Sequence, residues 1–137
     1  MKYKLIDHTA DFGIHVFGGD APELFEHAAL AMFELTVDAG SPGDCHQSLV
    51  SVEGKDWPDL MVNWLRELLY LWAGTEKILR SIAVEELTAN RISARVELES
   101  FQAEQHSILS EIKAVTYHQI QVGPIGDHWE SKIIFDV

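Results

Sequence analysis

Apolar residues recur with helical spacing in two segments of the chain. The first segment, 20–37, opens with Asp20-Ala-Pro-Glu23, which offers a capping carboxylate, a proline in the first turn and an acid near the positive end of the helix dipole. The second segment opens with the same chemistry at Asp56-Trp-Pro-Asp59 and is expected to stop at Gly74. Its apolar side chains cover so much of the helix circumference that we expect this second helix to be mostly buried.

Segments with alternating polarity or many β-branched residues predict strands before, between and after the helices. The polar residues 7–11 favour a turn, so the first two strands are expected to pair as a hairpin. Residues 123–126 are expected to be the turn between the last two strands. The expected strands are 2–6, 13–17, 48–53, 78–87, 92–99, 113–118 and 129–137. Strands 78–87 and 92–99 are expected to pair as a second hairpin. This order predicts the α+β fold class, as a two-layer sandwich with two amphipathic helices packed on a mostly antiparallel β-sheet.

The length and composition of the chain fit a single domain over 1–137. Although 47% of the residues are apolar, no window approaches the roughly 18 uninterrupted apolar residues of a membrane span. The N-terminus runs from Lys2 and Lys4 into Asp7 without the apolar region of a signal peptide. The single cysteine, Cys45, cannot form an intramolecular disulfide. We therefore expect a cytoplasmic protein that does not interact with membranes.

The chain is strongly acidic, with 10 Lys and Arg residues against 22 Asp and Glu residues and a net charge of −12. Residues 20–59 contain nine acids and one base, so most of the net charge lies in this segment. Affinity for nucleic acids comes mostly from neutralising phosphates, and the basic residues here are dispersed. We therefore expect no direct nucleic-acid binding. Nothing in the sequence indicates an oligomeric state.

Two polar clusters at the ends of predicted strands offer oxygen ligands. Asp7-His-Thr-Ala-Asp11 follows the first strand, and Asp136 precedes Val137, the last residue of the sequence, whose carboxylate adds a second anionic group. Hard cations such as Ca²⁺ and Mg²⁺ prefer several carboxylate oxygens in one place, and Asp11 completes such a set if the strands pair. The alternative is that Asp7 and Asp11 only form the turn.

Other common active-site chemistries lack their signatures. The seven histidines include no HExxH motif and no i, i+4 helical pair, which disfavours a zinc site. No GxSxG motif or phosphate-binding glycine pattern is present, and Cys45 lies in an acidic loop that should raise its pKa. Lys113 is the only Lys or Arg between Arg95 and Lys132. It either covers the sheet with its aliphatic stem or has a functional role.

Three motifs together resemble the archease family. They are Asp7-His-Thr-Ala-Asp-Phe-Gly-Ile14, Glu111-Ile-Lys-Ala-Val-Thr-Tyr-His118 and Ile133-Ile-Phe-Asp-Val137, with two capped helices between the first and the second. The resemblance spans the whole chain and departs only at 99–102, where the family often has a Gly-Glu pair. It implies an activator of an RtcB-type RNA ligase of tRNA splicing and RNA repair. Activation would promote guanylylation of the ligase's active-site histidine, multiple turnover and broader nucleotide use.

The resemblance also implies roles for individual residues. Asp11, Asp136 and Val137 correspond to a metal site for a divalent cation, with Ca²⁺ expected and Mg²⁺ as the alternative. Lys113 corresponds to the lysine of the late motif, and we expect it to take part in activating the partner. The chain would then not be an enzyme. The competing interpretations are a metal-dependent hydrolase that uses Asp7, His8 and Asp11 with a bound water, and a general chaperone.

The first predicted helix also offers a candidate docking surface. Leu30 lies near the middle of a polar sector that holds Glu23, Glu26 and Glu34. An apolar side chain surrounded by carboxylates could anchor a partner protein while the carboxylates attract its basic surface. The implied ligase must have such a basic surface, because it binds RNA. The alternative is a scattered surface leucine on a solvated face.

Overall fold

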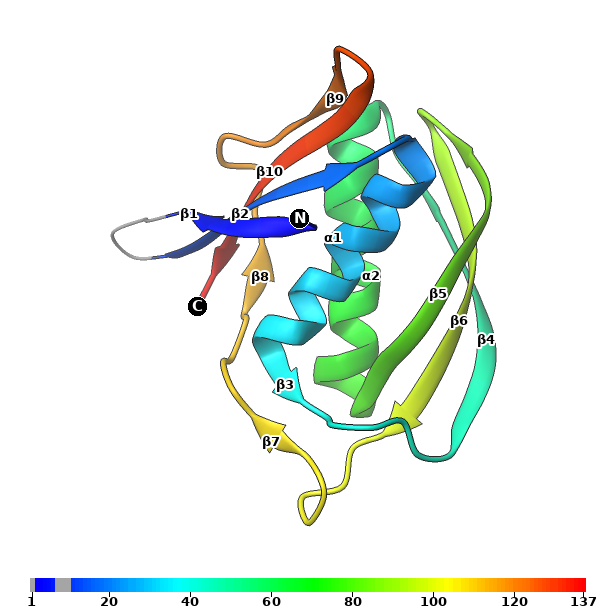
Figure 1. Cartoon of the computed structure of the whole chain (residues 1–137), viewed down its shortest axis with the longest axis vertical. Helices are drawn as coiled ribbons and strands as arrows, with labels where there is room; N and C mark the ends of the chain where they lie inside the picture. Colours follow the sequence, from blue (N-terminus) through cyan, green and yellow to red (C-terminus); the bar gives the residue numbers. More distant parts are fainter. Residues whose placement is uncertain (1, 7–10) are drawn as a thin grey trace.

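The structure, a computed structural model, describes residues 2–6 and 11–137, apart from the side chain of Asp11 (Figure 1). Its helices are α1 (Ala21–Thr36) and α2 (Trp57–Thr75). Its strands are β1 (Tyr3–Ile6), β2 (Asp11–Gly18), β3 (Val37–Asp38), β4 (Cys45–Glu53), β5 (Lys77–Thr88), β6 (Arg91–Ser100), β7 (Ser107–Ile108), β8 (Ala114–Val115), β9 (Gln121–Ile125) and β10 (His128–Asp136).

Both helices begin where the sequence predicts. The Asp20 carboxylate accepts a hydrogen bond of 2.9 Å from the Glu23 N–H, which caps α1. The Asp56 carboxylate accepts an equivalent bond of 2.9 Å from the Asp59 N–H at the start of α2. α2 runs one residue past the expected end at Gly74. The local capping chemistry of the two Asp-X-Pro-acid segments is therefore sufficient to position both helix starts.

The two helices lie between two antiparallel sheets (Figure 1). The larger sheet has the order β1-β2-β10-β8, with β9 also paired to β10, and the smaller sheet has the order β4-β6-β5. The α+β class with two helices and antiparallel sheets is confirmed. The layering differs from the expected two-layer sandwich, because there are three layers. Buried residues of α1 such as Leu24, Ala28 and Phe33 spread over about 200° of its circumference, which is wide enough for a sheet on each side.

The core between the layers contains large side chains from both helices and from β10. Trp64, Phe25 and Phe135 are fully buried. The indole N–H of Trp64 donates a hydrogen bond of 3.1 Å to the Phe25 carbonyl, which satisfies the polar atom of this side chain inside the core. The expected burial of α2 is confirmed by Leu60, Met61, Val62, Trp64, Leu65, Leu68 and Leu69.

The strand pairing confirms both predicted hairpins, β1–β2 and β5–β6, and corrects two details near the C-terminus. Within the expected strand 113–118, only Ala114–Val115 pairs as a strand. Gln121–Ile125, which includes most of the expected turn, is strand β9. Pro124 lies on this strand, which pairs with β10 alone and is therefore an edge strand, where prolines are tolerated in sheets.

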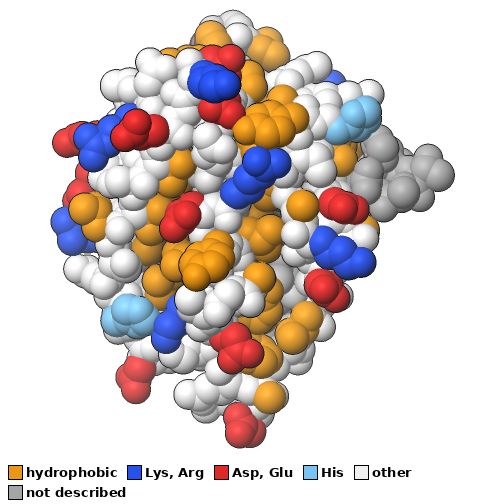
Figure 2. Space-filling view, turned by 180° about the vertical axis from the view of Figure 1, so that it is seen from behind, with side chains coloured by type: hydrophobic (Ala, Val, Ile, Leu, Met, Phe, Trp, Pro, Cys, Tyr) orange, Lys and Arg blue, Asp and Glu red, His pale blue; other side chains and the backbone are white. Residues whose placement is uncertain are grey.

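Two features of the structure concern possible contact with a membrane or with a nucleic acid. No helix among the described residues is long and apolar enough to cross a membrane. On the face shown in Figure 2, Lys and Arg side chains are dispersed among Asp and Glu side chains. This face therefore carries no basic stripe of the kind that follows a nucleic-acid backbone.

Candidate functional site

The three motif segments meet at the C-terminal end of β10. Asp136 on β10 is directly opposite Asp11 on β2. On the other side of β10, Asp136 is opposite Ala114 on β8, and the Lys113 N–H donates a hydrogen bond of 2.7 Å to the Asp136 carbonyl. The starts of β2 and β8 thus lie on either side of the end of β10, near the point marked C in Figure 1. We call Asp11, Lys113, Asp136 and Val137 the motif edge.

Two acidic residues of the motif edge, Asp11 and Asp136, occupy directly opposite positions in the register of β2 and β10. Directly opposite residues in antiparallel strands occupy the same face of a sheet, and like charges at such positions are destabilising. Asp136 is exposed, as are the neighbouring Lys113 and Val137. A cation bound by the acidic residues would relieve the repulsion. Carboxylate oxygens fit hard cations such as Ca²⁺ and Mg²⁺ better than they fit soft metals.

Part of the predicted site lies outside the described residues. This applies to Asp7 and His8, on which the hydrolase interpretation depends, and to the side chain of Asp11. Among the side chains that the structure does describe, no group of three or more His, Cys, Asp or Glu is arranged to hold a metal ion. The metal site of Asp11, Asp136 and Val137 therefore stays a prediction, with the backbone of positions 11 and 136 brought together by the register.

Contacts with α2 hold the backbone next to Lys113. The Arg66 Nε–H donates a hydrogen bond of 3.1 Å to the Val115 carbonyl, and its guanidinium lies 4.8 Å from the centroid of the Tyr117 ring. The Tyr117 hydroxyl donates a bond of 2.6 Å to Asp59 Oδ1. Because this bond favours the carboxylate and the neutral phenol, it lowers the pKa of Asp59 and raises the pKa of Tyr117.

Sequence reasoning missed a second polar cluster, which joins β2 and β10. One oxygen of the Glu130 carboxylate accepts a hydrogen bond from His15 Nε2 and the other accepts one from His128 Nε2. The His128 bond raises the pKa of His128 and lowers the pKa of Glu130. His15 is therefore a histidine with a structural partner, as expected for its strand. Alternation along the last strand places residues 128 and 130 on one face, but only the register adds His15.

The four residues predicted for docking on α1 have different environments. Leu30 is half-buried and packs against the core. Glu23 bonds to the backbone at the start of its own helix, and Glu26 Oε2 accepts a bond of 3.0 Å from the Val84 N–H on β5. Glu34 is exposed. The expectation that Leu30 is exposed and surrounded by free carboxylates is therefore wrong, because the second sheet packs against this side of α1. A docking role for these residues stays a prediction.

The environment of Cys45 agrees with the expected raised pKa. Desolvation raises the pKa of its thiol, and the carboxylates of Glu99 and Glu97 raise it further. Because the thiolate is the nucleophilic form, this environment disfavours a role for Cys45 in covalent chemistry.

Comparisons with known proteins bear directly on the resemblance of the three motifs. The model of the archease protein family matches residues 3–137. The chain belongs to the archease family. Protein archease of Methanosarcina acetivorans is 35% identical over 140 residues, which cover 99% of this chain and 96% of that protein. Protein archease of Archaeoglobus fulgidus is 32% identical over 137 residues, which cover 100% of both chains.

Two solved structures share the fold of this archease. The solution structure of Methanobacterium thermoautotrophicum protein 1598 matches with a TM-score of 0.80 at 27% identity, covering 99% of both chains. The crystal structure of a Thermotoga maritima archease, described as a possible chaperone, matches with a TM-score of 0.63 at 21% identity. It covers 98% of this chain and 96% of that one, and at this identity the likeness concerns the fold alone.

Proposed function

We propose that this archease activates an RtcB-type RNA ligase and is not itself a catalyst. Activation promotes guanylylation of the ligase's active-site histidine and allows multiple turnover in tRNA splicing or RNA repair. The observation that carries the proposal is the strand register at the end of β10, which places the three archease motifs side by side. The net charge of −12 supports a protein partner in preference to RNA, because the chain repels phosphates.

The motif edge holds a divalent cation in this proposal. Asp11, Asp136 and the Val137 carboxylate are its ligands, with Ca²⁺ as the expected ion and Mg²⁺ as the alternative. Support comes from the two acidic residues directly opposite each other across β2 and β10, and from the exposure of Asp136. When bound, such a cation neutralises negative charge on phosphate oxygens. Asp136 and Val137 are exposed, so a cation held by them would lie at the surface, where a ligase can reach it.

Lys113 acts beside this site on the partner's reaction. Its backbone is tied to Asp136, and its side chain is exposed at the motif edge. An ammonium group there can stabilise the charge on a phosphoryl group during its transfer to the ligase. Arg66 and Tyr117 hold the strand on which Lys113 depends, so they are positioning residues.

Single-turnover guanylylation of the cognate ligase, with and without this protein, tests the proposal. The wild-type protein should raise the rate, and Asp136→Asn and Lys113→Gln should each lose about tenfold or more of the stimulation. Asp44→Asn and Lys55→Gln are the matched controls, because both residues are exposed and neither belongs to the larger sheet. These controls should stimulate as the wild type does.

Equal guanylylation rates with and without the protein would contradict activation. Hydrolysis of generic phosphoesters by the protein alone, abolished by Asp11→Ala, would instead favour the metal-dependent hydrolase. Protection of unrelated proteins from aggregation, without any effect on the ligase, would favour the chaperone.

A further inference from the structure

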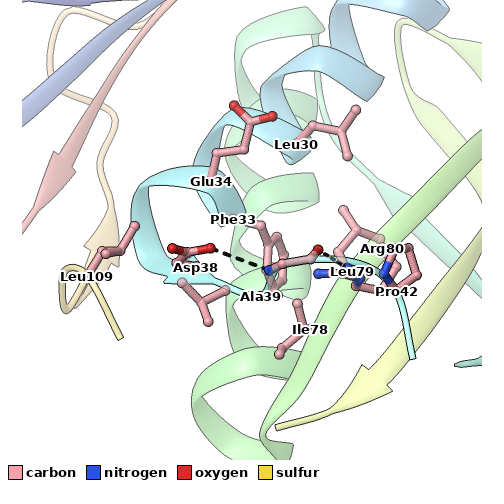
Figure 3. Close-up of a pocket in the computed structure, with 12 residues that line it drawn as sticks. Leu30, Phe33, Glu34, Asp38, Ala39, Pro42, Ile78, Leu79, Arg80 and Leu109 are labelled. Carbon is pink, nitrogen blue, oxygen red and sulfur yellow. Dashed lines mark hydrogen bonds between the residues drawn. The ribbon is translucent and has the colours of Figure 1, made fainter. Parts of the chain in front are cut away.

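A pocket of about 460 Å³ opens beside α1 (Figure 3). Its walls come from α1, β3, the loop after β3, β5 and the segment after β7, so distant parts of the sequence converge on it. We call it the α1 pocket. The larger apolar side chains of its lining are Leu30, Phe33, Val37, Ile78, Leu79 and Leu109.

A buried polar cluster holds the walls of the α1 pocket in place. The Arg80 guanidinium donates to the Gly40 carbonyl (Figure 3) and pairs with Glu99, with Nε 3.3 Å from Oε1. Glu99 also accepts bonds of 3.1 Å from the Gly43 N–H and 3.2 Å from His106 Nε2. Glu99 and His106 are both buried. Because these bonds join the loop after β3 to β5 and β6, the pocket exists before any ligand arrives.

The charge at the mouth of the α1 pocket is negative. Glu34 projects from α1 one turn after Leu30, and Asp38 lies on β3 (Figure 3). Both acids are exposed. Arg80 is the only basic residue of the lining, and its guanidinium is already paired with Glu99. The pocket therefore presents an apolar floor with a carboxylate rim.

An exposed leucine extends the apolar surface outward from the floor. Leu109, which lines the pocket, is 57% exposed, and the adjacent Ile108 is 59% exposed. The Leu109 backbone is nevertheless fixed, because its N–H donates a bond of 2.8 Å to the Thr36 carbonyl at the end of α1. A rigid, exposed apolar side chain beside a preformed pocket is typical of a docking surface in protein complexes.

We propose that the α1 pocket binds a surface segment of the partner protein in which an apolar side chain is flanked by Lys or Arg. The apolar side chain fills the floor between Leu30 and Leu109, and the basic side chain pairs with Glu34 or Asp38. This inference rests on the proposed function, because it takes the ligase as the partner. It assigns binding to a surface separate from the motif edge.

The chemistry of the pocket argues against other classes of ligand. Phosphate groups of a nucleic acid or an anionic lipid would meet the carboxylates of Glu34 and Asp38. Small-molecule sites place a few polar groups so that they converge on the ligand, whereas the carboxylates of Glu34 and Asp38 lie at the rim of this pocket. A basic, apolar polypeptide segment satisfies both the floor and the rim.

Association and dissociation rates with the cognate ligase test the proposal. Leu109→Asp should weaken binding about tenfold or more, mainly through faster dissociation, because it places a charge in the apolar contact. The double variant Glu34→Lys/Asp38→Lys should slow association, and the wild-type association rate should fall as salt is raised.

Two exposed residues elsewhere provide matched controls. Leu49 on β4 is 57% exposed, like Leu109, so Leu49→Asp makes the same change outside the pocket. Glu67→Lys reverses an exposed charge on α2. Both controls should bind the ligase within about twofold of the wild type, and the melting temperatures of all variants should confirm that they fold.

Three results would overturn the proposal. Wild-type affinity in Leu109→Asp and in the double variant would remove the α1 pocket from the interface. Equal losses in Leu109→Asp and Leu49→Asp would show a nonspecific effect. Dimers of this chain that Leu109→Asp dissociates would show that a second copy covers the pocket. If the wild-type protein neither binds nor stimulates the ligase, the proposed function itself fails, and that outcome is distinct from these three.

Discussion

The motif edge and the α1 pocket are built in different ways. At the motif edge, the register of β2 and β10 places position 11 directly opposite Asp136, and the exposed Lys113 is bonded to the Asp136 backbone. At the α1 pocket, an apolar floor is held by the buried cluster of Arg80, Glu99 and His106. The first arrangement places two acidic residues directly opposite each other, whereas in the second the acidic residue Glu99 is paired with Arg80 and His106. We propose that this difference separates a site for chemistry from a surface for recognition.

Breaking the buried cluster should have the largest effect on stability. Glu99→Ala leaves the Arg80 side chain, which is only 10% exposed, without its carboxylate. We expect the free energy of unfolding to fall by about 3–5 kcal/mol in urea titrations. Glu85→Ala is the control, because its partner Arg95 forms an ion pair of 3.1 Å that is largely exposed. The control should cost less than about 1 kcal/mol, and equal losses would contradict a supporting role for the cluster.

Shortening Leu30 should have a moderate effect on stability. Because this side chain is half-buried and packs on the core, Leu30→Ala should lower the free energy of unfolding by about 1–2 kcal/mol, less than a fully buried leucine would. Leu49→Ala, at an exposed position, should change it by less than about 0.5 kcal/mol. Identical unfolding curves for the two variants would contradict the packing of Leu30 against the core.

Removing an oxygen ligand should weaken cation binding at the motif edge. In titration calorimetry, Asp136→Asn should bind Ca²⁺ about tenfold more weakly than the wild type, and a C-terminal extension beyond Val137 should have a similar effect. Ca²⁺ should also raise the melting temperature of the wild type by mass action. Unchanged Ca²⁺ affinity in the extended protein would remove the Val137 carboxylate from the site, and unchanged affinity in Asp136→Asn would remove Asp136.

The smallest expected effect is a pH dependence from the pair of His128 and Glu130, at the other end of β10. The pKa of His128 lies above its ordinary 6.5. Its contribution to the stability of the folded state is therefore complete below pH 6.5 and is lost as the pH rises through the raised pKa. The pKa of Glu130 lies below its ordinary 4.5. Its contribution to the stability of the folded state is therefore present above pH 4.5 and is lost as the pH falls through the lowered pKa.

Melting temperatures of the wild type and His128→Gln across pH measure this contribution. The difference between them should be largest between about pH 4.5 and 6.5 and should shrink at higher pH. A difference that grows above pH 6.5 would contradict the assigned charge states. Adding Ca²⁺ should leave this difference unchanged, because the pair does not depend on the motif edge.

Much of the fold follows from short-range signals in the sequence. The Asp20 and Asp56 caps position both helices, and alternation predicts the hairpin of β5 and β6. The candidate metal residues could also be named in advance, because Asp11 and Asp136 belong to the first and last motifs. Their proximity depended on the pairing of two strands, which the register of β2 and β10 provides. Such features depend on a few neighbouring residues or on motifs, and both are visible in one sequence.

Features that depend on long-range packing could not be predicted in the same way. The buried arc of α1 is visible as periodicity, but periodicity does not show that a second sheet covers part of it. The bond between Glu26 and Val84 exists only because β5 packs beside α1. The pairing of Arg80 with Glu99 depends on the β5–β6 register and the loop after β3, and neither residue belongs to a motif.

Separating binding from activation tests the division between the two regions most directly. The decisive measurement is single-turnover guanylylation of the cognate ligase as a function of activator concentration, for Asp136→Asn and Leu109→Asp. Asp136→Asn should bind within about twofold of the wild type and fail to stimulate even at saturation. Leu109→Asp should need about tenfold more protein and then reach the wild-type rate. If the two variants lose binding and stimulation together, the motif edge and the α1 pocket are not separate functional surfaces.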